Sequence, residues 1–331
     1  KQIKNRVRQL GVTLTLLALL VTQVLAAVPA YLIPGGNTVG IKLYTRGLVV
    51  TAVSDGMAAQ AAGLKAGDTI LAADGDPVRT AQSLCAHFQE GKPVVLTVLR
   101  GEQEAEFLVS PEKTEDGCRL GLTLRDHIAG IGTVTYYDPD SRRFGALGHG
   151  VSSAGDLRLT PAASGFVVSS RVVEVRRGSR GTPGMLKGDF DLTRDSGTLY
   201  ANTECGIFGK LSAEDAAKIT GAALPIAKKD EIKTGRAAIL ATVSGNETRE
   251  YDIEIEKIYS PSGSTRNLLL RVTDEELLAQ TGGVVQGMSG SAILQDGKII
   301  GAVTHVLLDD PSRGYGIFIE NMLSAAGLSS E

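Results

Sequence analysis

The part of this 331-residue chain that follows Gly121 is divided into short apolar segments by turn residues, and this pattern limits the possible folds more than any other feature. Within residues 237–260, two strand-like segments flank Gly245-Asn246, which is typical of a two-strand hairpin. Similar turn signals recur at Asp296-Gly297 and at Asp138-Pro139-Asp140. Only three short stretches here favour helices, at residues 213–220, 274–280 and 320–326. Many short strands with few helices predict a mainly β fold, a barrel or a sandwich.

The composition excludes several classes of function. Hydrophobic residues make up 43% and charged residues 21% of the chain, a balance found in ordinary globular proteins. The net charge is −3 and the folded part has no long basic block, so nucleic acid is not an expected partner. Neither a C-x-x-C nor an H-E-x-x-H motif is present, so no metal site and no cofactor are expected. The cysteines and histidines are Cys85, Cys118, Cys205, His87, His127, His149 and His305.

A basic flank over residues 1–9 precedes an uncharged, mostly apolar run over residues 10–33. The run is long enough to cross a bilayer as a helix, which takes about 20 apolar residues. Small residues at Ala26, Ala27 and Ala30 also fit a signal peptide that is removed after export. Membrane anchor and cleaved signal both remain open, and both place the following domains outside the cytoplasm.

Residues 37–112 carry a specific motif, GLKAGDTILAADGDPV, at residues 63–78. This stretch resembles the PDZ pattern of Gly-Leu, Gly-Asp, Asp-Gly and a final Val at nearly every position. The resemblance implies a PDZ domain, which binds a peptide C-terminus, in a partner or in the chain itself, by adding it to a sheet edge. The segment VGIKL takes the place of the family's carboxylate-binding loop, so the amides of Gly40, Ile41 and Lys42 are the expected carboxylate ligands. A small structural β domain without a ligand is the alternative.

The motif GMSGS at residues 287–291 places Ser289 between glycines, directly before an apolar strand. One interpretation is a tight turn that leads into a hairpin. The other is a nucleophile, since a serine hydroxyl attacks a carbonyl when a base and an oxyanion-binding site lie within reach. The backbone N–H groups of Gly287 and Ser289 are the expected oxyanion donors, because glycine permits the turn that makes them converge.

His149 is the candidate base, because it lies between two glycines in ALGHGV at the end of a predicted strand. A turn histidine that hydrogen-bonds to the backbone is the alternative. His305 follows an apolar strand and fits a structural role, His87 lies in the PDZ-like part, and His127 lies in the connector.

The spacing of the residues does not decide which acid would orient the base. Asp274 in RVTDEELL is one candidate, although it also fits the first turn of a helix with a capping box formed by Thr273 and Glu276. Cys205 in TECGIFG is a rival nucleophile, which would make the chain a thiol hydrolase. The rival acids are Asp189, Asp191 and Asp195.

Residues 273–323, together with GALGHGV upstream, resemble the SpoIVB-type peptidases, the stage IV sporulation signalling proteases. The resemblance implies one N-terminal transmembrane segment, a PDZ domain and a trypsin-like serine peptidase domain of two β-barrels, here over residues 120–331. It also implies His149 as general base, Asp274 as orienting acid and Ser289 as nucleophile. One departure is Ala292, where the family has a proline.

The same resemblance implies a regulatory protease rather than a degradative one. Family members act between the forespore and the mother cell, where they cleave themselves and the regulatory partner of an intramembrane protease, which leads to sigma-K activation. By the same analogy, the strand GAVTHV borders the substrate. The residues expected to pair with the substrate backbone and line its specificity pocket are Ala302, Val303, Thr304 and His305. A non-catalytic PDZ adaptor with an inactive peptidase-like domain is the alternative.

Overall fold

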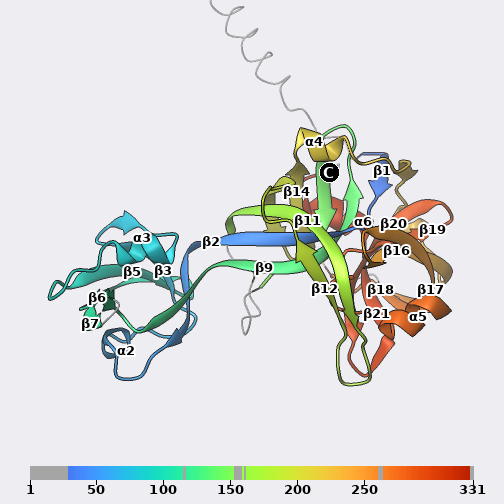
Figure 1. The fold of residues 1–331 in the computed structure, drawn as a ribbon. Helices are drawn as coiled ribbons and strands as arrows, with labels where there is room; N and C mark the ends of the chain where they lie inside the picture. Colours follow the sequence, from blue (N-terminus) through green and yellow to red (C-terminus); the bar gives the residue numbers. More distant parts are fainter. Residues whose placement is uncertain (1–28, 115–116, 153–158, 160–161, 260–263, 329–331) are drawn as a thin grey trace, which may run out of the picture.

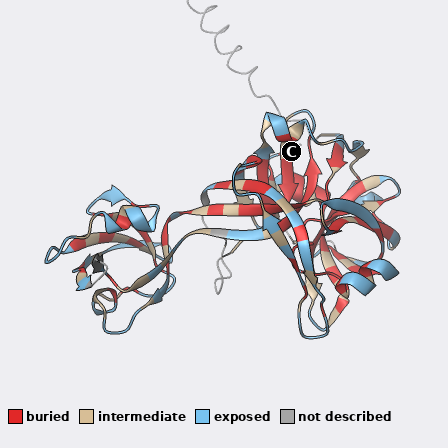
Figure 2. Cartoon of the chain, in the orientation of Figure 1, coloured by how far each residue is buried: buried red, intermediate tan, exposed pale blue. Residues whose placement is uncertain are grey.

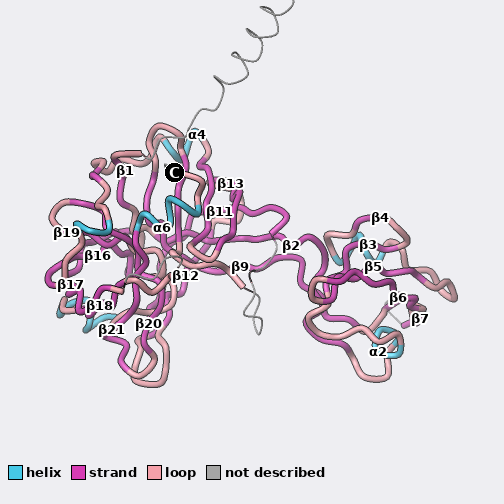
Figure 3. The backbone as a smooth tube through the Cα atoms, turned by 180° about the vertical axis from the view of Figure 1, so that it is seen from behind, coloured by secondary structure: helices cyan, strands magenta, loops and turns pink. Residues whose placement is uncertain are grey.

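The protein consists of two packed lobes and a smaller unit that projects from them (Figure 1). The computed structural model describes residues 29–114, 117–152, 159, 162–259 and 264–328. Buried residues gather inside the two lobes and, separately, inside the smaller unit (Figure 2), so each part has its own core. Seen from behind, the smaller unit is again joined to the lobes through β2 (Thr38–Val53) and β9 (Leu122–Tyr137) (Figure 3).

The smaller unit, residues 48–124, has one core enclosed by a small sheet and short helices. Strand β3 pairs with β2 and β5, and β5 pairs with β6. Alternate residues Val94, Leu96 and Val98 are completely buried, as expected for a strand with one face toward a core. Besides parts of β2 and β9, its elements are α2 (Ala58–Ala61), β3 (Thr69–Ala73), β4 (Asp76–Pro77), α3 (Ala81–Cys85), β5 (Val94–Arg100), β6 (Gln103–Val109), β7 (Glu112–Thr114) and β8 (Gly117–Arg119).

The smaller unit is inserted between two strands of the N-terminal lobe, so the lobe begins before the unit in the chain and continues after it. Strands β2 (Thr38–Val53) and β9 (Leu122–Tyr137) are each 16 residues long and run side by side from the lobe into the unit. Residues 38–45 pair with β9 on one side and β11 (Ala162–Arg176) on the other. They therefore belong to the lobe, so neither a PDZ domain beginning at residue 37 nor a peptidase body beginning at residue 120 describes the fold.

Gly40, Ile41 and Lys42 consequently do not form the expected carboxylate-binding loop. Ile41 pairs with Val167 of β11 and with Gly130 of β9. A strand flanked on both sides uses its backbone N–H groups in the two ladders, which leaves none to bind a carboxylate. A Cβ atom at Gly40 would lie 2.5 Å from the Phe190 ring, so this glycine permits close packing within the lobe.

The strands of the N-terminal lobe pair in a closed circuit. β9 pairs with β10, β10 with β14, β14 with β13, β13 with β11, β11 with β2, and β2 returns to β9. Phe144 and Ile207 are completely buried inside this circuit's core. The remaining elements of the lobe are β1 (Tyr31–Pro34), β10 (Arg143–Ala146), β11 (Ala162–Arg176), β12 (Met185–Phe190), β13 (Gly197–Thr203), β14 (Gly206–Leu211), α4 (Ala213–Ala216) and β15 (Leu224–Pro225).

The C-terminal lobe is a closed barrel of six strands in the order β16-β17-β18-β21-β20-β19. On β17, buried Tyr251, Ile253 and Ile255 alternate with more exposed residues, so one face of the strand lines the core. Its elements are η1 (Lys229–Glu231), β16 (Gly235–Ser244), β17 (Glu247–Ile258), β18 (Leu268–Val272), α5 (Glu275–Thr281), β19 (Ala292–Gln295), β20 (Lys298–Leu307), β21 (Asp310–Phe318) and α6 (Ile319–Ala325).

The two lobes share an apolar interface. Tyr136 and Phe208 of the N-terminal lobe belong to the same buried cluster as Ile317 and Met322 of the C-terminal lobe. Each buried side chain of this size contributes about 2 kcal/mol to the free energy of folding. The lobes are therefore held at a boundary along which loops from both can form one site.

The hairpin turns predicted from the sequence are confirmed, and the helices predicted over residues 274–280 and 320–326 match α5 and α6 to within one residue. Gly245 and Asn246 connect β16 to β17. Asp296 and Gly297 connect β19 to β20 with φ of 51° and 75°, the left-handed pair that suits a tight hairpin. The helix predicted over residues 213–220 covers only Ala213–Ala216.

The end of the apolar N-terminal run forms a β-strand rather than part of a membrane segment. Strand β1 includes Leu32, which is completely buried in the cluster between the lobes. The predicted membrane segment therefore does not extend to Ile33, and its residues 10–28 lie outside the described residues. Within the described residues, no helix has both the length and the apolar character needed to span a membrane.

Candidate active site

His149 is presented by a sharp turn at the end of β10. Leu147 and Gly148 both have left-handed backbones, with φ of 69° and 67°. For leucine this conformation costs about 1–2 kcal/mol, and such strain is concentrated at functional sites. A Cβ atom at Gly148 would lie 2.9 Å from Thr304 and 3.0 Å from Ile317, so glycine lets the turn pack against the C-terminal lobe. The turn thereby carries His149 to the boundary between the lobes.

Ser289 lies in the loop between α5 and β19, and the carbonyl groups of this loop are fixed by Thr133 of β9. The Thr133 hydroxyl donates to the Gly287 carbonyl at 2.6 Å, and the Thr133 N–H donates to the Ser289 carbonyl at 3.0 Å. Within the described part of the chain, the N–H groups of Gly287 and Ser289 donate to no other group. Gly287 has a φ of 99°, a conformation that favours glycine. The loop thus leaves free the two donors that an oxyanion site requires.

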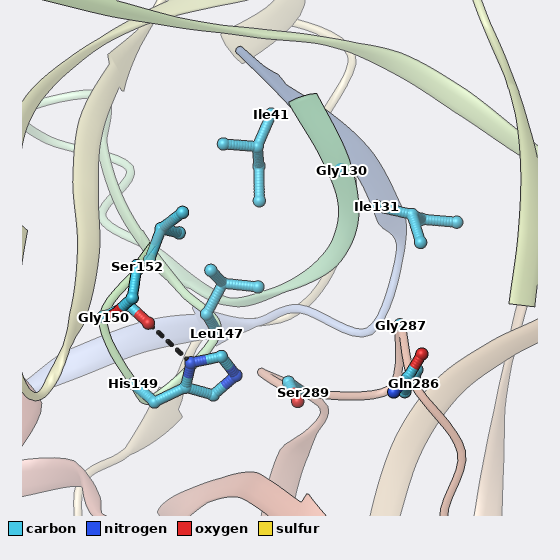
Figure 4. A pocket seen from close by; sticks show the side chains of 11 residues that line it. Ile41, Gly130, Ile131, Leu147, His149, Gly150, Ser152, Gln286, Gly287 and Ser289 are labelled. Atoms are coloured by element: carbon cyan, nitrogen blue, oxygen red, sulfur yellow. Dashed lines mark hydrogen bonds between the residues drawn. The ribbon is translucent and has the colours of Figure 1, made fainter. Parts of the chain in front are cut away.

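A cavity of about 300 Å³ lies between the His149 turn and the Ser289 loop (Figure 4). No charged side chain lines it, and its walls are mostly aliphatic. The lining residues are Ile41, Gly130, Ile131, Leu147, His149, Gly150, Val151, Ser152, Gln286, Gly287 and Ser289. An apolar cavity with a few polar groups at one wall is the usual form of a binding site for an organic substrate.

The hydrogen bonds of His149 define its tautomer. Its Nδ1 lies 2.9 Å from the Gly150 carbonyl oxygen, which can only accept a hydrogen bond. Neutral His149 therefore carries its proton on Nδ1 and has an unprotonated Nε2, the form that a general base needs. Figure 4 shows this second ring nitrogen facing the side of the cavity where Ser289 lies. The Ser289 hydroxyl itself donates to the Thr304 carbonyl at 2.8 Å.

His305 lies beside His149, with ring centroids 5.1 Å apart. Burial lowers the pKa of His149 below its ordinary value, while the bond to the Gly150 carbonyl opposes that shift. Burial lowers the pKa of His305 to about 4, with further contributions from His149 and Arg266. Both rings are therefore neutral near pH 7, so the base is available to accept a proton.

A family description, SpoIVB peptidase S55, matches residues 115–323, which is more than half of the chain. The chain belongs to this family. It is therefore a serine peptidase, and the two residues that the family resemblance implied as base and nucleophile line one cavity. The PDZ domain description matches residues 9–110, which includes most of the inserted unit.

The chain is also similar to individual proteins over parts of its length. It is 34% identical over 87 residues to "Putative zinc metalloprotease Atu1380" of Agrobacterium fabrum, a match that covers 26% of this chain and 23% of that protein. Among solved structures, the Rv3671c protease from M. tuberculosis in its active form has 16% identity and a TM-score of 0.34, covering 61% of this chain and 76% of that one. The HtrA-type protease AlgW with a decapeptide has 13% identity and a TM-score of 0.36, covering 92% of this chain and 65% of that one.

The pH dependence of cleavage by this S55-family peptidase should reflect the lowered pKa of His149. A general base acts only when neutral, so activity is lost as pH falls through the pKa of the base. Because burial lowers the pKa of His149 below 6.5, the acid-side midpoint of kcat/KM is expected below pH 6.5. Cleavage rates of fluorescein-labelled casein from about pH 4 to about pH 9 measure this midpoint. A midpoint above pH 7 would contradict a buried His149 as the base.

Asp274 does not occupy the position expected of an orienting acid. It is the N-cap of α5, and its Oδ1 accepts the N–H of Leu277 at 2.8 Å. Within the described residues, no hydrogen bond or ion pair joins Asp274 to His149, whose Nδ1 is bonded to Gly150 instead. The helix predicted from the sequence does begin here, but Asp274 caps it instead of following Thr273 into the first turn.

The rival acids and the rival nucleophile Cys205 do not fit their proposed roles either. Asp189, Asp191 and Asp195 are exposed on β12 and the turn after it. Burial raises the pKa of the Cys205 thiol, with a smaller contribution from Glu204, which disfavours the thiolate that a cysteine nucleophile needs.

The strand expected to border the substrate divides into a buried part and a part at the site. Ala302 and Val303 are buried and pair with Ile317 and Gly316 of β21; Val303 packs in the barrel core and Ala302 in the cluster between the lobes. The β20–β21 register shifts between Val303 and His305, which makes Thr304 an unpaired bulge residue. The bulge turns the Thr304 carbonyl toward Ser289.

Thr133 is a site residue that no sequence motif marks. It lies within a long strand, and nothing in its neighbours distinguishes it from other buried threonines. Its contacts join the Ser289 loop to the His149 turn, because its carbonyl also accepts the N–H of Leu147 at 3.2 Å. These partners are distant in sequence, so no local motif could have identified it.

Proposed function

We propose that this S55-family peptidase is a serine endopeptidase with Ser289 as nucleophile and His149 as general base. The observation that carries the proposal is that Ser289 lines the same cavity as His149, whose proton is held on Nδ1 and whose Nε2 faces that side. The free N–H groups of Gly287 and Ser289 would bind the oxyanion. General base action contributes about 10²–10⁴-fold in rate, and one oxyanion donor about 10²–10³-fold.

The reaction begins with rotation of the Ser289 hydroxyl away from the Thr304 carbonyl. The hydroxyl proton then passes to Nε2 of His149 while the Oγ–C bond to the substrate carbonyl forms. His149 returns that proton to the leaving nitrogen as the C–N bond breaks, and water hydrolyses the acyl-enzyme by the same steps in reverse order. The rotation forfeits a hydrogen bond worth about 1 kcal/mol. A substrate N–H that donates to the Thr304 carbonyl would replace that bond and release the hydroxyl.

The two closed strand circuits support a trypsin-like arrangement of two barrels. The strand circuit of the N-terminal lobe supplies His149 and the C-terminal barrel supplies Ser289, and each contributes its residue from a loop at the shared boundary. In this proposal the inserted unit, a PDZ domain, is placed between two strands of the first barrel.

The family assignment supports a role in sporulation signalling. We propose that the substrates are the chain itself and a regulatory membrane protein on the route to sigma-K activation, and that the enzyme acts outside the cytoplasm, tethered to a membrane or secreted. The apolar run over residues 10–28 supports that location. The PDZ domain supports recognition of a protein chain.

Labelling with a fluorescent phosphonate, which reacts with activated serines, tests the proposed function. The purified chain is expected to be labelled at Ser289, located by mass spectrometry of the modified peptide. New N-termini should form during incubation of the same sample. A chain that is neither labelled nor cleaved would be a PDZ adaptor with an inactive peptidase domain.

His305 is proposed to influence which bonds are cleaved, since it follows the bulge at Thr304 and lies beside His149. Replacing it with alanine is expected to change the relative cleavage rates at different sites of casein by about tenfold, the effect of altering one pocket contact. Peptide mapping of timed digests measures the ratio. A variant that cleaves the same bonds in the same proportions would exclude this specificity role.

A further inference from the structure

The β13–β14 hairpin packs directly against the turn that carries His149. Strand β14 pairs with β10 up to Ile207 and Ala146. A Cβ atom at Gly206 would lie 2.9 Å from the Ala146 carbonyl, and one at Gly150 would lie 2.6 Å from the Thr203 carbonyl. These close backbone approaches fix the hairpin end relative to the residues that flank His149.

Asn202 at the end of β13 forms two hydrogen bonds with one residue of that turn. Its side-chain Oδ1 accepts the N–H of Val151 at 2.9 Å, and its Nδ2 donates to the Val151 carbonyl at 2.9 Å. The neighbouring Thr203 side chain accepts the N–H of Cys205 and donates to the Gly206 carbonyl, which keeps the hairpin tip in shape. The Asn202 amide is therefore held firmly on the His149 turn.

The Val151 N–H and the Gly150 carbonyl belong to the same planar peptide unit. Asn202 bonds to one edge of this unit, and Nδ1–H of His149 donates to the opposite edge at 2.9 Å. Fixing the N–H therefore also fixes the direction of the carbonyl, and a bonded N–H polarises the carbonyl into a better acceptor.

We infer that Asn202 positions the general base by acting through the Gly150–Val151 peptide. This inference rests on the proposed role of His149 and deepens it. An uncharged amide suits the site because it both accepts from the Val151 N–H and donates to the Val151 carbonyl. A carboxylate would accept the first bond but would face the carbonyl with a second acceptor.

Two substitutions at this position are expected to move the acid limb of the pH profile in opposite directions. Asn202→Ala loses both hydrogen bonds to Val151, so the His149 turn is held less firmly. Misplacing a catalytic group costs about 10²-fold in rate, so kcat on fluorescein-labelled casein should fall by about that factor, with KM changed less than about threefold. Its acid limb should move to lower pH, because the Gly150 carbonyl bond raises the pKa of His149. Asn202→Asp keeps the Val151 N–H bond and adds a negative charge, so its limb should move to higher pH, with a smaller loss of kcat.

Asn37→Ala is the matched control, because Asn37 also accepts a hydrogen bond through its side chain, from the Tyr137 hydroxyl at 2.7 Å, away from the cavity lining. It should lower thermal stability without moving the pH profile. Asp274→Ala tests the acid expected from the sequence. The inference is overturned if Asp274→Ala shows the kcat loss and the shifted limb while Asn202→Ala behaves like the unmodified chain.

The proposed function is tested separately by Ser289→Ala in the same full-length chain. If Ser289→Ala still cleaves casein, the serine mechanism fails and the positioning role falls with it. If Ser289→Ala is inactive and Asn202→Ala retains its kcat and acid limb, the inference alone fails.

Discussion

Replacing Ser289 with alanine should abolish cleavage of the chain and of casein while leaving the fold in place. Loss of such a nucleophile lowers kcat by about 10⁶-fold, because the base then has no hydroxyl to deprotonate and the oxyanion donors alone support only a residual rate. The structural cost is small, since the hydroxyl makes one hydrogen bond, to the Thr304 carbonyl. Losing that bond costs about 1 kcal/mol. Casein cleavage and thermal unfolding of the purified variant measure both effects.

Ser291→Ala is the matched control, because Ser291 lies two residues away in the same motif. Its hydroxyl is buried and has no hydrogen-bond partner within the described residues, so it does not reach the cavity. Removing an unpaired buried hydroxyl is neutral or stabilising. The variant should therefore cleave at the normal rate and unfold at the same or a higher temperature. If Ser291→Ala were inactive and Ser289→Ala active, the nucleophile would have been assigned to the wrong serine.

Local patterns in the sequence predicted the β character of the lobes because each hairpin depends on neighbouring residues. Asp296 and Gly297 supply the two left-handed positions of their turn without help from the rest of the fold. The insertion could not be predicted in this way. Whether residues 38–45 pair within the PDZ-like unit or with β11, more than 110 residues later, depends on tertiary packing that VGIKL itself does not encode.

Part of the candidate site was also predictable from local patterns in the sequence. His149 and Ser289 could be identified because glycines beside a polar residue mark turns that expose its side chain. Asp274 came from the family resemblance alone, because an acid before a short helix satisfies two patterns, and its side chain caps that helix here. Asn202 gives no sequence signal, since its bonds are to the backbone of a residue 51 positions away.

Replacing Gly290 with alanine should disrupt the site through the backbone. The added Cβ would lie 1.9 Å from the Thr133 carbonyl oxygen and 2.6 Å from the Leu147 nitrogen, and Gly290 has a φ of 100°. Neither neighbour is a flexible side chain, so the Ser289 loop must move away from β9. Overpacking costs about 1–3 kcal/mol and the left-handed backbone about 1–2 kcal/mol more. Since a displacement of 1 Å costs about 10²-fold in rate, casein cleavage should fall by at least that factor.

Gly297→Ala separates the effect of overpacking from that of backbone strain. Gly297 has a φ of 75°, but a Cβ there would meet nothing within 4 Å. This control carries the backbone cost alone and should lose about 1–2 kcal/mol with normal cleavage. Chemical denaturation and casein assays on both variants give the comparison. If Gly290→Ala resembled Gly297→Ala in both unfolding free energy and casein cleavage, the contact with Thr133 would not hold Ser289 in place. If only Gly290→Ala loses activity, the nucleophile depends on a backbone contact with the lobe that carries its base, because Thr133 binds the Ser289 loop and the His149 turn together.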